Sequence, residues 1–150
     1  MKLTGEVIFN APRDRTWAVL NDPAVLQKHM PGCESLHAIG PDRYEALLKI
    51  GVAAIKGSYK ATLTVADQRE PESYRLRVEG SGKPGFVKGE GTVHLHEQGD
   101  RTRVTYDGDL QVGGLIARVG LRLLGGLTEK MTREFFEGLA REVDPSRPHP

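Results

Sequence analysis

The chain has almost no cysteine and no long apolar run, and each absence excludes a class of protein. Cys33 is its single thiol, so an internal disulfide and a cysteine-based metal cluster are both excluded. No charge-free segment approaches the roughly 18 apolar residues that a membrane span requires. The first residues, Met1 to Glu6, lack the apolar core of a signal peptide. We therefore expect a cytoplasmic protein that is not integral to a membrane.

The chain also lacks an excess of charge of either sign. It has 21 Lys and Arg against 20 Asp and Glu, which leaves a net charge of +1 and no bulk attraction to nucleic acid. With 150 residues and 38% hydrophobic content it can bury one sizeable core. We expect a single domain over residues 1–143 and a disordered, proline-rich tail over residues 144–150.

Apolar and polar residues alternate from residue 34 to residue 112, which is typical of antiparallel strands with one dry face. Six strands are predicted there, and four of the connections between them carry turn signals, at Gly40-Pro41-Asp42, Glu70-Pro71-Glu72, Gly82-Lys83-Pro84 and Gln98-Gly99-Asp100. Before them, residues 3–9 read as a first strand. Two short helices around Trp17 and Leu26 follow it, the second starting at Asn21-Asp22-Pro23.

One long amphipathic helix is predicted over residues 114–143. Its apolar stripe recurs every four residues and consists of Leu115, Val119, Leu123, Leu127, Met131, Phe135 and Leu139. The preceding strands provide the only apolar surface large enough to cover this stripe. We therefore predict an α+β domain in which a curved, seven-stranded antiparallel sheet wraps around the C-terminal helix.

The dry face of the sheet carries many small residues, namely Gly5, Ala46, Ala61, Gly89, Gly91 and Gly108. Missing side chains either leave a cavity or allow the sheet to bend sharply, and both interpretations stay open. The first predicts a ligand site between sheet and helix. Its predicted lining is Leu26, Met30, Tyr59, Leu63, Leu76, Phe86, Tyr106, Leu115, Val119 and Leu123. Ordinary core packing is the alternative for each of these residues.

Several motifs point to a known family. They are Ala11-Pro12 followed by Trp17, Leu20-Asn21-Asp22-Pro23, Met30-Pro31-Gly32-Cys33-Glu34-Ser35-Leu36, Gly85-Phe86, and Val112-Gly113-Gly114-Leu115-Ile116-Ala117 with Gly120. On these residues the chain, from Gly5 to about Leu139, resembles the CoxG-like family, named for the CoxG subunit of carbon monoxide dehydrogenase. That family belongs to the START-like, birch-pollen-allergen-like helix-grip superfamily (SRPBCC), whose element order matches the one predicted here.

The resemblance implies an accessory binding protein more than a catalyst. CoxG-like proteins accompany carbon monoxide dehydrogenases and related molybdenum hydroxylases at the inner face of the cell membrane, where they recruit the enzyme or handle a quinone. The implied ligand is lipid-like or quinone-like, and the implied partner is such a hydroxylase. Operon-encoded members often carry a longer C-terminal extension that reaches the membrane, whereas seven residues follow Val143 here. Membrane contact would then be peripheral.

Two other functions stay open. The first is a polyketide cyclase or dehydratase, for which Tyr59, Tyr106, His29 and His37 are the candidate polar groups. The second is an adaptor for a membrane or a dehydrogenase, because Arg118 and Arg122 flank an apolar segment. In the competing interpretation, Leu121 and Leu124 of that segment pack under the loop that ends at Pro31-Gly32.

No catalytic residue, cofactor or metal site is assigned from the sequence. The stretch Gly80-Ser81-Gly82-Lys83-Pro84-Gly85 matches a dinucleotide-binding pattern, but it lies between two predicted strands and contains a proline. His94 and His96 have the spacing of metal ligands but lie on the wet face. Cys33 is expected to be a buried, inert thiol.

Overall fold

A computed structural model describes residues 1–52 and 55–145 of the chain. In chain order the described elements are β1 (Lys2–Phe9), α1 (Arg13–Leu20), α2 (Pro23–His29), β2 (Cys33–Gly40), β3 (Arg43–Ile50), β4 (Gly57–Arg69), β5 (Ser73–Gly82), β6 (Gly85–Gln98), β7 (Arg101–Gly113), the 3-10 helix η2 (Gly114–Val119) and α3 (Leu121–Val143). The predicted α+β helix-grip architecture is confirmed, as are the two short helices and the six strands after them.

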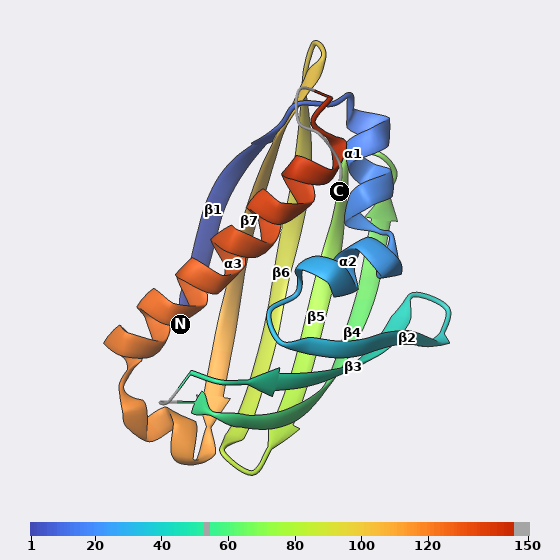
Figure 1. Cartoon of the computed structure of the whole chain (residues 1–150). Helices are drawn as coiled ribbons and strands as arrows, with labels where there is room; N and C mark the ends of the chain where they lie inside the picture. The colour runs from blue at the N-terminus through green and yellow to red at the C-terminus, as the bar shows by residue number, and fades with distance from the viewer. Residues whose placement is uncertain (53–54, 146–150) are drawn as a thin grey trace.

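The strands form one antiparallel sheet in the order β1-β7-β6-β5-β4-β3-β2. The sheet curves around α3, which crosses its concave side diagonally, and α1 and α2 lie on the same side (Figure 1). The backbone of α3 lies closest to β1, and its other main neighbours are α1, α2 and η2. The helix therefore covers one edge of the sheet more closely than it covers the middle strands.

Local chemistry explains where the short helices begin. Pro12 has an extended backbone just before α1, and its carbonyl accepts the N–H of Thr16 at 3.0 Å. At the start of α2 the Asp22 carboxylate accepts the N–H of Ala24 at 3.0 Å, and Pro23 occupies the first turn, where no backbone donor is needed. The start of α2 follows the prediction from the sequence.

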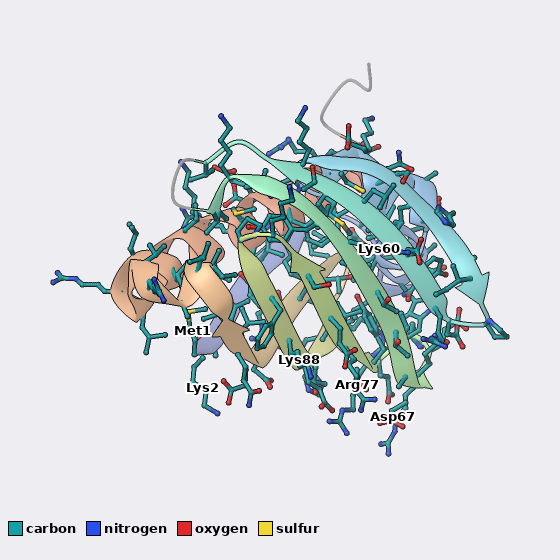
Figure 2. The ribbon with its side chains drawn as sticks, turned by 90° about the horizontal axis from the view of Figure 1, so that it is seen from below. Met1, Lys2, Lys60, Asp67, Arg77 and Lys88 are labelled. Atoms are coloured by element: carbon teal, nitrogen blue, oxygen red, sulfur yellow. The ribbon has the colours of Figure 1, made fainter. Side chains whose placement is uncertain are left out.

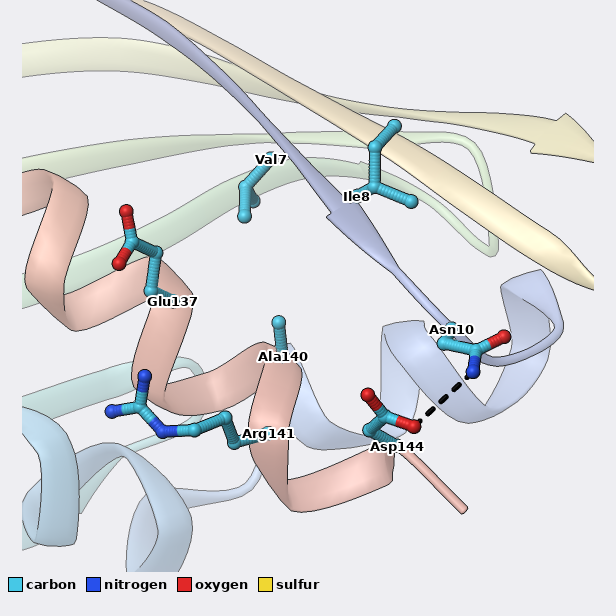
Figure 3. Close-up of a pocket in the computed structure, with 7 residues that line it drawn as sticks. All are labelled: Val7, Ile8, Asn10, Glu137, Ala140, Arg141 and Asp144. Atoms are coloured by element: carbon cyan, nitrogen blue, oxygen red, sulfur yellow. Dashed lines mark hydrogen bonds between the residues drawn. The ribbon is translucent and has the colours of Figure 1, made fainter. Parts of the chain in front are cut away.

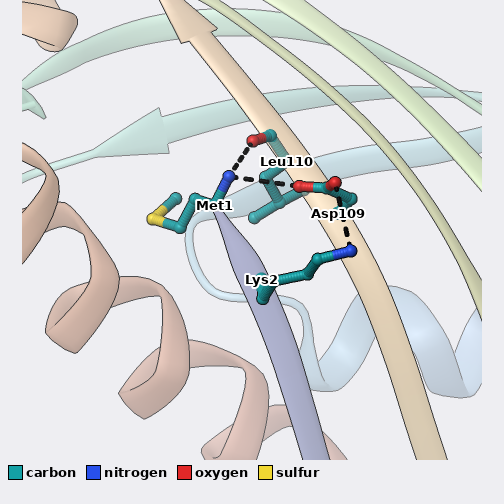
Figure 4. A network of polar contacts seen from close by, with 4 residues as sticks. All are labelled: Met1, Lys2, Asp109 and Leu110. Carbon is teal, nitrogen blue, oxygen red and sulfur yellow. Dashed lines mark hydrogen bonds and ion pairs between the residues drawn. The ribbon is translucent and has the colours of Figure 1, made fainter.

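The start of the chain is fastened to β7 (Figure 4). The Met1 amino group donates to the Leu110 carbonyl at 2.9 Å and to the Asp109 carboxylate at 3.1 Å, and Lys2 Nζ lies 3.5 Å from the same carboxylate. The hydrogen bond from the amino terminus holds the pKa of Asp109 below its usual value. These contacts fix the first residue of β1 beside the last third of β7.

The prediction of one continuous helix over residues 114–143 is wrong. The segment is divided into η2 and α3 by Gly120, whose φ of +100° does not continue a helix. Within α3 the buried residues are Leu124, Phe136, Gly138, Leu139 and Val143. A four-residue repeat drifts by about 40° per step against a helix of about 3.6 residues per turn. The predicted stripe therefore cannot stay on one face over this length.

The end of α3 meets the region between β1 and α1, where the Asn10 amide donates to the Asp144 carboxylate at 3.1 Å. The predicted disordered tail falls mostly on residues 146–150, which lie outside the described residues. The division into a domain over residues 1–143 and a tail stays a prediction. No helix among residues 1–52 and 55–145 has the length and apolar character needed to cross a bilayer.

Candidate ligand-binding site

Strand register arranges apolar side chains in rows across the concave face of the sheet. One row, from β3 to β7, consists of Tyr44, Leu63, Val78, Gly89 and Leu110. The next row consists of Ala46, Ala61, Gly80, Val87 and Val112. The alternating positions face the other way, and Figure 2 shows Arg77 and Lys88 projecting from the convex side. The sheet therefore has one apolar inner face and one charged outer face, as predicted.

The inner face is unevenly enclosed. Towards the β6–β7 turn it is fully packed, and we call this region the closed end, defined by Phe9, Leu95, Val104 and Leu139, which are 0–3% exposed. Towards η2 a group of inward apolar side chains is only half-buried, although Ala46 and Ala61 beside them are buried, and we call this region the open end. It is defined by Leu48, Leu63, Leu76, Val78, Leu110 and Val112 of the sheet and by Leu127 and Met131 of α3. An inward apolar surface that the protein does not itself cover is available to a ligand.

Glycine does not create this difference by leaving empty space. The position above Gly5 is filled by the Tyr106 ring and hydroxyl, and the position above Gly89 is filled by Leu110. At Gly91 an added Cβ would lie 2.6 Å from the Asp107 carbonyl oxygen of the neighbouring strand. At these positions the structure supports the second interpretation, in which small residues permit close packing and sheet curvature.

Four predicted lining residues contribute to the inner face around α2 and the middle strands. Leu26 packs against both buried clusters of the molecule, while Met30 and Leu63 pack against the smaller cluster formed by Leu36, Ala46 and Ala61. Leu76 lies between Val65 and Gly91 and is half-buried. The structure thus brings Leu26, Met30, Leu63 and Leu76 onto one face, but their contact with a ligand stays a prediction.

The two predicted tyrosines contribute hydroxyl groups in different ways. The Tyr59 hydroxyl donates to the Ile55 carbonyl at 2.5 Å. The Tyr106 ring stacks on Phe136 with 4.5 Å between ring centroids. Desolvation by burial raises the pKa of both hydroxyls, so both are neutral hydrogen-bond donors at physiological pH. Neither is suited to act as an ionised general base.

Three predicted lining residues are not enclosed. Phe86 is 43% exposed and lies over Gly113 on the convex face, where it borders a shallow groove of about 290 Å³ with Lys60, Ser81 and Lys88. Leu115 and Leu123 are 60% and 57% exposed. The prediction that these residues line the interior is wrong, because Phe86 is on the outer side of the β6 alternation and Gly120 changes the phase between η2 and α3. Val119 is half-buried in η2.

Other inner-face residues were missed although the sequence carried their signal. Val78 lies two residues beyond Leu76, and Leu110 lies two residues beyond Gly108, so strand alternation alone places them on the inner face. Leu127 and Met131 belonged to the predicted helical stripe but were not assigned to the site. They are half-buried on α3.

A second hollow lies at the outer edge, between β1 and the last turns of α3 (Figure 3). It has a volume of about 200 Å³ and is lined by Val7, Ile8, Asn10, Glu137, Ala140, Arg141 and Asp144. Ligand pockets for drug-sized molecules usually measure about 300–1,000 Å³. This cleft is therefore smaller than a typical pocket for a drug-sized ligand.

Comparison with known proteins identifies the family. A family model described as the CoxG subunit of carbon monoxide dehydrogenase matches residues 5–144. The chain belongs to the CoxG family. The resemblance drawn from short motifs is thereby confirmed over nearly the whole chain.

Solved structures show how widely the fold of this CoxG-family protein is shared. A conserved protein from Geobacillus kaustophilus is 38% identical, with 97% of each chain covered and a TM-score of 0.93. A START superfamily protein from Mycobacterium smegmatis is 17% identical, with coverage of 95% and 94% and a TM-score of 0.67. The di-domain ARO/CYC protein BexL is 15% identical over 96% of this chain and 46% of its own, with a TM-score of 0.69. A comparison with curated proteins gave no match.

Ionisable groups of the CoxG-family chain pair with each other outside the open end. His29 Nε2 lies 2.7 Å from Glu142 Oε1, which Lys28 Nζ also contacts at 2.8 Å. His37 is exposed and lies 3.9 Å from Glu45. The histidines that were candidate acids or bases are therefore engaged with carboxylates and do not face the half-buried apolar side chains.

Cysteine and the paired histidines show no sign of metal or nucleophilic chemistry. Burial raises the pKa of the Cys33 thiol, which donates to the Ser35 carbonyl at 3.2 Å. His94 and His96 stack 6.2 Å apart, and His96 bonds to the Thr105 hydroxyl. Within residues 1–52 and 55–145 no three His, Cys, Asp or Glu side chains are grouped as metal ligands.

Proposed function

We propose that this CoxG-family protein binds a hydrophobic small molecule, lipid-like or quinone-like, against the inner face of the open end. The observation that carries the proposal is the half-buried state of inward apolar residues such as Val78, Leu110 and Met131. Covering apolar surface stabilises a complex by roughly 25 cal/mol per Å². A ligand would complete the burial that the closed end achieves with its own side chains.

The polarity of the inner face favours a ligand with few polar atoms. Its described lining is dominated by aliphatic side chains, and its two tyrosine hydroxyls are neutral donors. The Tyr59 hydroxyl is already engaged with the Ile55 carbonyl. A ligand bound at the open end would contact mainly the aliphatic rows, because the Tyr106 hydroxyl lies over Gly5 of β1 and its ring packs in the closed-end cluster. A quinone or an acyl lipid has the largely apolar surface that such contacts require.

The family supplies a partner for the proposal. Because the matching family is described as the CoxG subunit of carbon monoxide dehydrogenase, we propose that the protein serves a molybdenum hydroxylase of that type by carrying or presenting the ligand. The same family supports a peripheral location at the inner face of the cell membrane.

A cyclase-like or aromatase-like enzyme is the alternative function. This alternative is supported by the fold shared with the ARO/CYC protein. At 15% identity that similarity is evidence for the architecture alone. Catalysis would require an acid or base within hydrogen-bond reach of the ligand. The neutral tyrosines and the carboxylate-paired His29 favour binding without turnover.

Native mass spectrometry of the purified protein, before and after incubation with a short-tailed menaquinone, tests the proposal. We expect one ligand per chain, and solvent extraction should return that ligand chemically unchanged. A chain that shows only its own mass, and takes up neither the quinone nor a fatty acid, would contradict the binding function. An extracted ligand with altered mass would establish the enzyme instead.

A further inference from the structure

The leucines with the highest exposed fractions among the described residues lie where η2 meets α3. Leu115, Leu121 and Leu123 are 60%, 66% and 57% exposed. Isolated exposed apolar residues are ordinary on a protein surface, but three within residues 115–123 form a concentrated apolar feature. The competing prediction, that Leu121 packs inward with Leu124, holds only for Leu124, which is 4% exposed.

Two backbone positions make this segment protrude. Gly114 has a φ of +78° and Gly120 a φ of +100°, so the chain turns sharply on both sides of η2. Between them only Ile116 is buried, and its N–H bonds to the Pro84 carbonyl at 2.8 Å. The 3-10 helix therefore contacts the rest of the protein through Ile116, while Leu115 and Arg118 are exposed.

The same end of the molecule is basic. From Leu110 to Thr128 the chain contains no Asp or Glu, and its only charges are the exposed Arg118 and Arg122. The ends of the neighbouring strands and their connections add Lys49, Lys56, Lys83 and Lys88 (Figure 1). Among the described residues none of these cations forms an ion pair. We call this basic and apolar surface the η2 end.

Two carboxylates offset this charge only in part: Glu129 is exposed on α3 seven residues after Arg122, and Glu79 lies opposite Lys88 in the strand register. Asp109 is engaged by the Met1 amino group and by Lys2. Away from the η2 end many cations are paired, as in Arg103 with Glu6 at 3.0 Å and Arg13 with Glu97 at 3.7 Å, whereas Arg15 and Arg101 form no ion pair among the described residues. A chain with a net charge of +1 therefore keeps unpaired positive charge where its leucines are exposed.

We propose that the η2 end docks on an anionic lipid bilayer. Protruding leucines flanked by unpaired cations match the chemistry of an interfacial segment, in which apolar side chains enter the headgroup region and basic ones bind phosphate. Leu115, Leu121 and Leu123 are the inserting side chains. Arg118 and Arg122 are the phosphate contacts, with the four lysines adding long-range attraction.

The η2 end lies next to the open end, so docking on a bilayer would place the proposed ligand site close to the lipid. Residues Leu110 and Val112 of β7 line the open end, and β7 runs directly into η2. A molecule docked through η2 therefore brings its half-buried inner face next to the bilayer, where a lipid-like ligand resides. This consequence rests on the proposed function, whereas docking itself does not.

Vesicle flotation tests the proposal directly. The full chain is mixed with vesicles of phosphatidylcholine alone, or of phosphatidylcholine with phosphatidylglycerol. We expect flotation with the anionic vesicles only, and release as salt is raised. A chain that stays in the soluble fraction with both vesicle types at low salt overturns the proposal.

Charge reversal with a matched control locates the surface. R118E/R122E and R15E/R101E change the net charge equally, but Arg15 and Arg101 are exposed on α1 and at the β6–β7 turn, away from η2. Since each basic residue near an anionic surface contributes about fivefold in affinity, the first variant should lose roughly thirtyfold or more. Equal losses in both variants would indicate attraction by net charge and overturn the assignment to the η2 end.

Removing the leucines tests insertion. Leu121→Ser with Leu123→Ser should lower vesicle affinity at least tenfold, while Ile39→Ser with Leu47→Ser, which removes comparably exposed side chains from β2 and β3, should not. Circular dichroism checks that the exposed substitutions leave the fold intact. A concentration-dependent dimer that the first pair abolishes would assign the surface to a second copy of this chain and refute docking.

A quinone titration of R118E/R122E separates this inference from the proposed function. Unchanged quinone affinity together with lost flotation supports docking as a distinct property. Flotation without quinone binding would leave docking in place and refute the ligand.

Discussion

The closed and open ends of the inner face are built from the same strands and the same alternating pattern, but they differ in what covers them. At the closed end α1 and the second half of α3 lie against the sheet, and Trp17 meets Tyr74 edge to face at 5.4 Å between ring centroids. At the open end the inward residues remain half-buried. Strand pattern therefore sets which residues face inward, while helix placement sets whether they are enclosed.

This division separates the residues that hold the fold together from those that the proposed ligand would contact. Phe9, Val104 and Leu139 are completely buried and supply the cohesion of the fold. The open end can then keep apolar surface accessible without unfolding the molecule. The following predictions test whether the two ends differ as described, starting with the largest expected effect.

Removal of a leucine from α3 should have very different effects at the two ends. Leu139→Ala deletes a fully buried side chain and should lower the free energy of unfolding by about 3–5 kcal/mol. Leu127→Ala, the same change on the same helix at the open end, should lower it by about 1 kcal/mol, because Leu127 is only half-buried. Urea unfolding measures both. Equal losses would show that the open end is packed as tightly as the closed end.

Filling the open end should block the ligand. Val78→Trp adds volume to the inner face and should weaken short-tailed menaquinone binding at least tenfold, or about 1.4 kcal/mol. Arg77→Trp is the matched control, since it introduces the same side chain one residue earlier on the convex face. Fluorescence titration compares the two. If both variants bind the quinone as the original chain does, the ligand does not occupy the inner face.

Two glycines near the open end should respond in opposite directions to the same substitution. An added Cβ meets no atom within 4 Å at either Gly120 or Gly126. Gly120→Ala should destabilise by about 1–2 kcal/mol because its φ of +100° strains any other residue. Gly126→Ala should stabilise by about 1 kcal/mol, because it replaces a glycine inside α3. Thermal unfolding measures both variants. If Gly120→Ala raised the stability, the backbone at residue 120 would not require the positive φ that separates η2 from α3.

Most of the fold could be predicted because its signals are local. Each of the four turn clusters falls between two strands of the sheet, and Asp22 with Pro23 begins α2 as expected. Alternation along a strand needs no knowledge of the partner strand, so the inner and outer faces were assigned correctly for residues such as Leu63 and Arg77.

The errors arose where a local backbone angle or a distant part of the chain decides the outcome. The exposure of Leu115 and Leu123 depends on the backbone angle of Gly120, and a residue-by-residue pattern does not reveal a positive φ. Gly5 and Gly89 were open to two interpretations because their space is filled by Tyr106 and Leu110 from the neighbouring strand β7. The open end itself depends on how α3 crosses the sheet, which is a property of packing and not of periodicity.

The smallest predicted effect concerns the contact that fastens α2, which borders both ends, to α3. Glu142 accepts hydrogen bonds from Lys28 and His29, and these, with Lys28 first, hold its pKa below the usual value. A carboxylate with a lowered folded-state pKa stabilises the fold above its unfolded pKa of about 4.3 and loses that contribution as pH falls through the folded value.

Glu142→Gln should therefore cost at most about 1 kcal/mol at neutral pH, and the difference from the original chain should vanish between about pH 5 and pH 3. Glu134→Gln is the control, because Glu134 is exposed on the same helix and forms no ion pair within the described part of the chain. Urea unfolding across this pH range measures both variants. A difference in the free energy of unfolding that persists below about pH 3 would show that Glu142 stabilises α2 through packing and not through its charge. The contact between α2 and α3 would then resemble the apolar packing of the closed end.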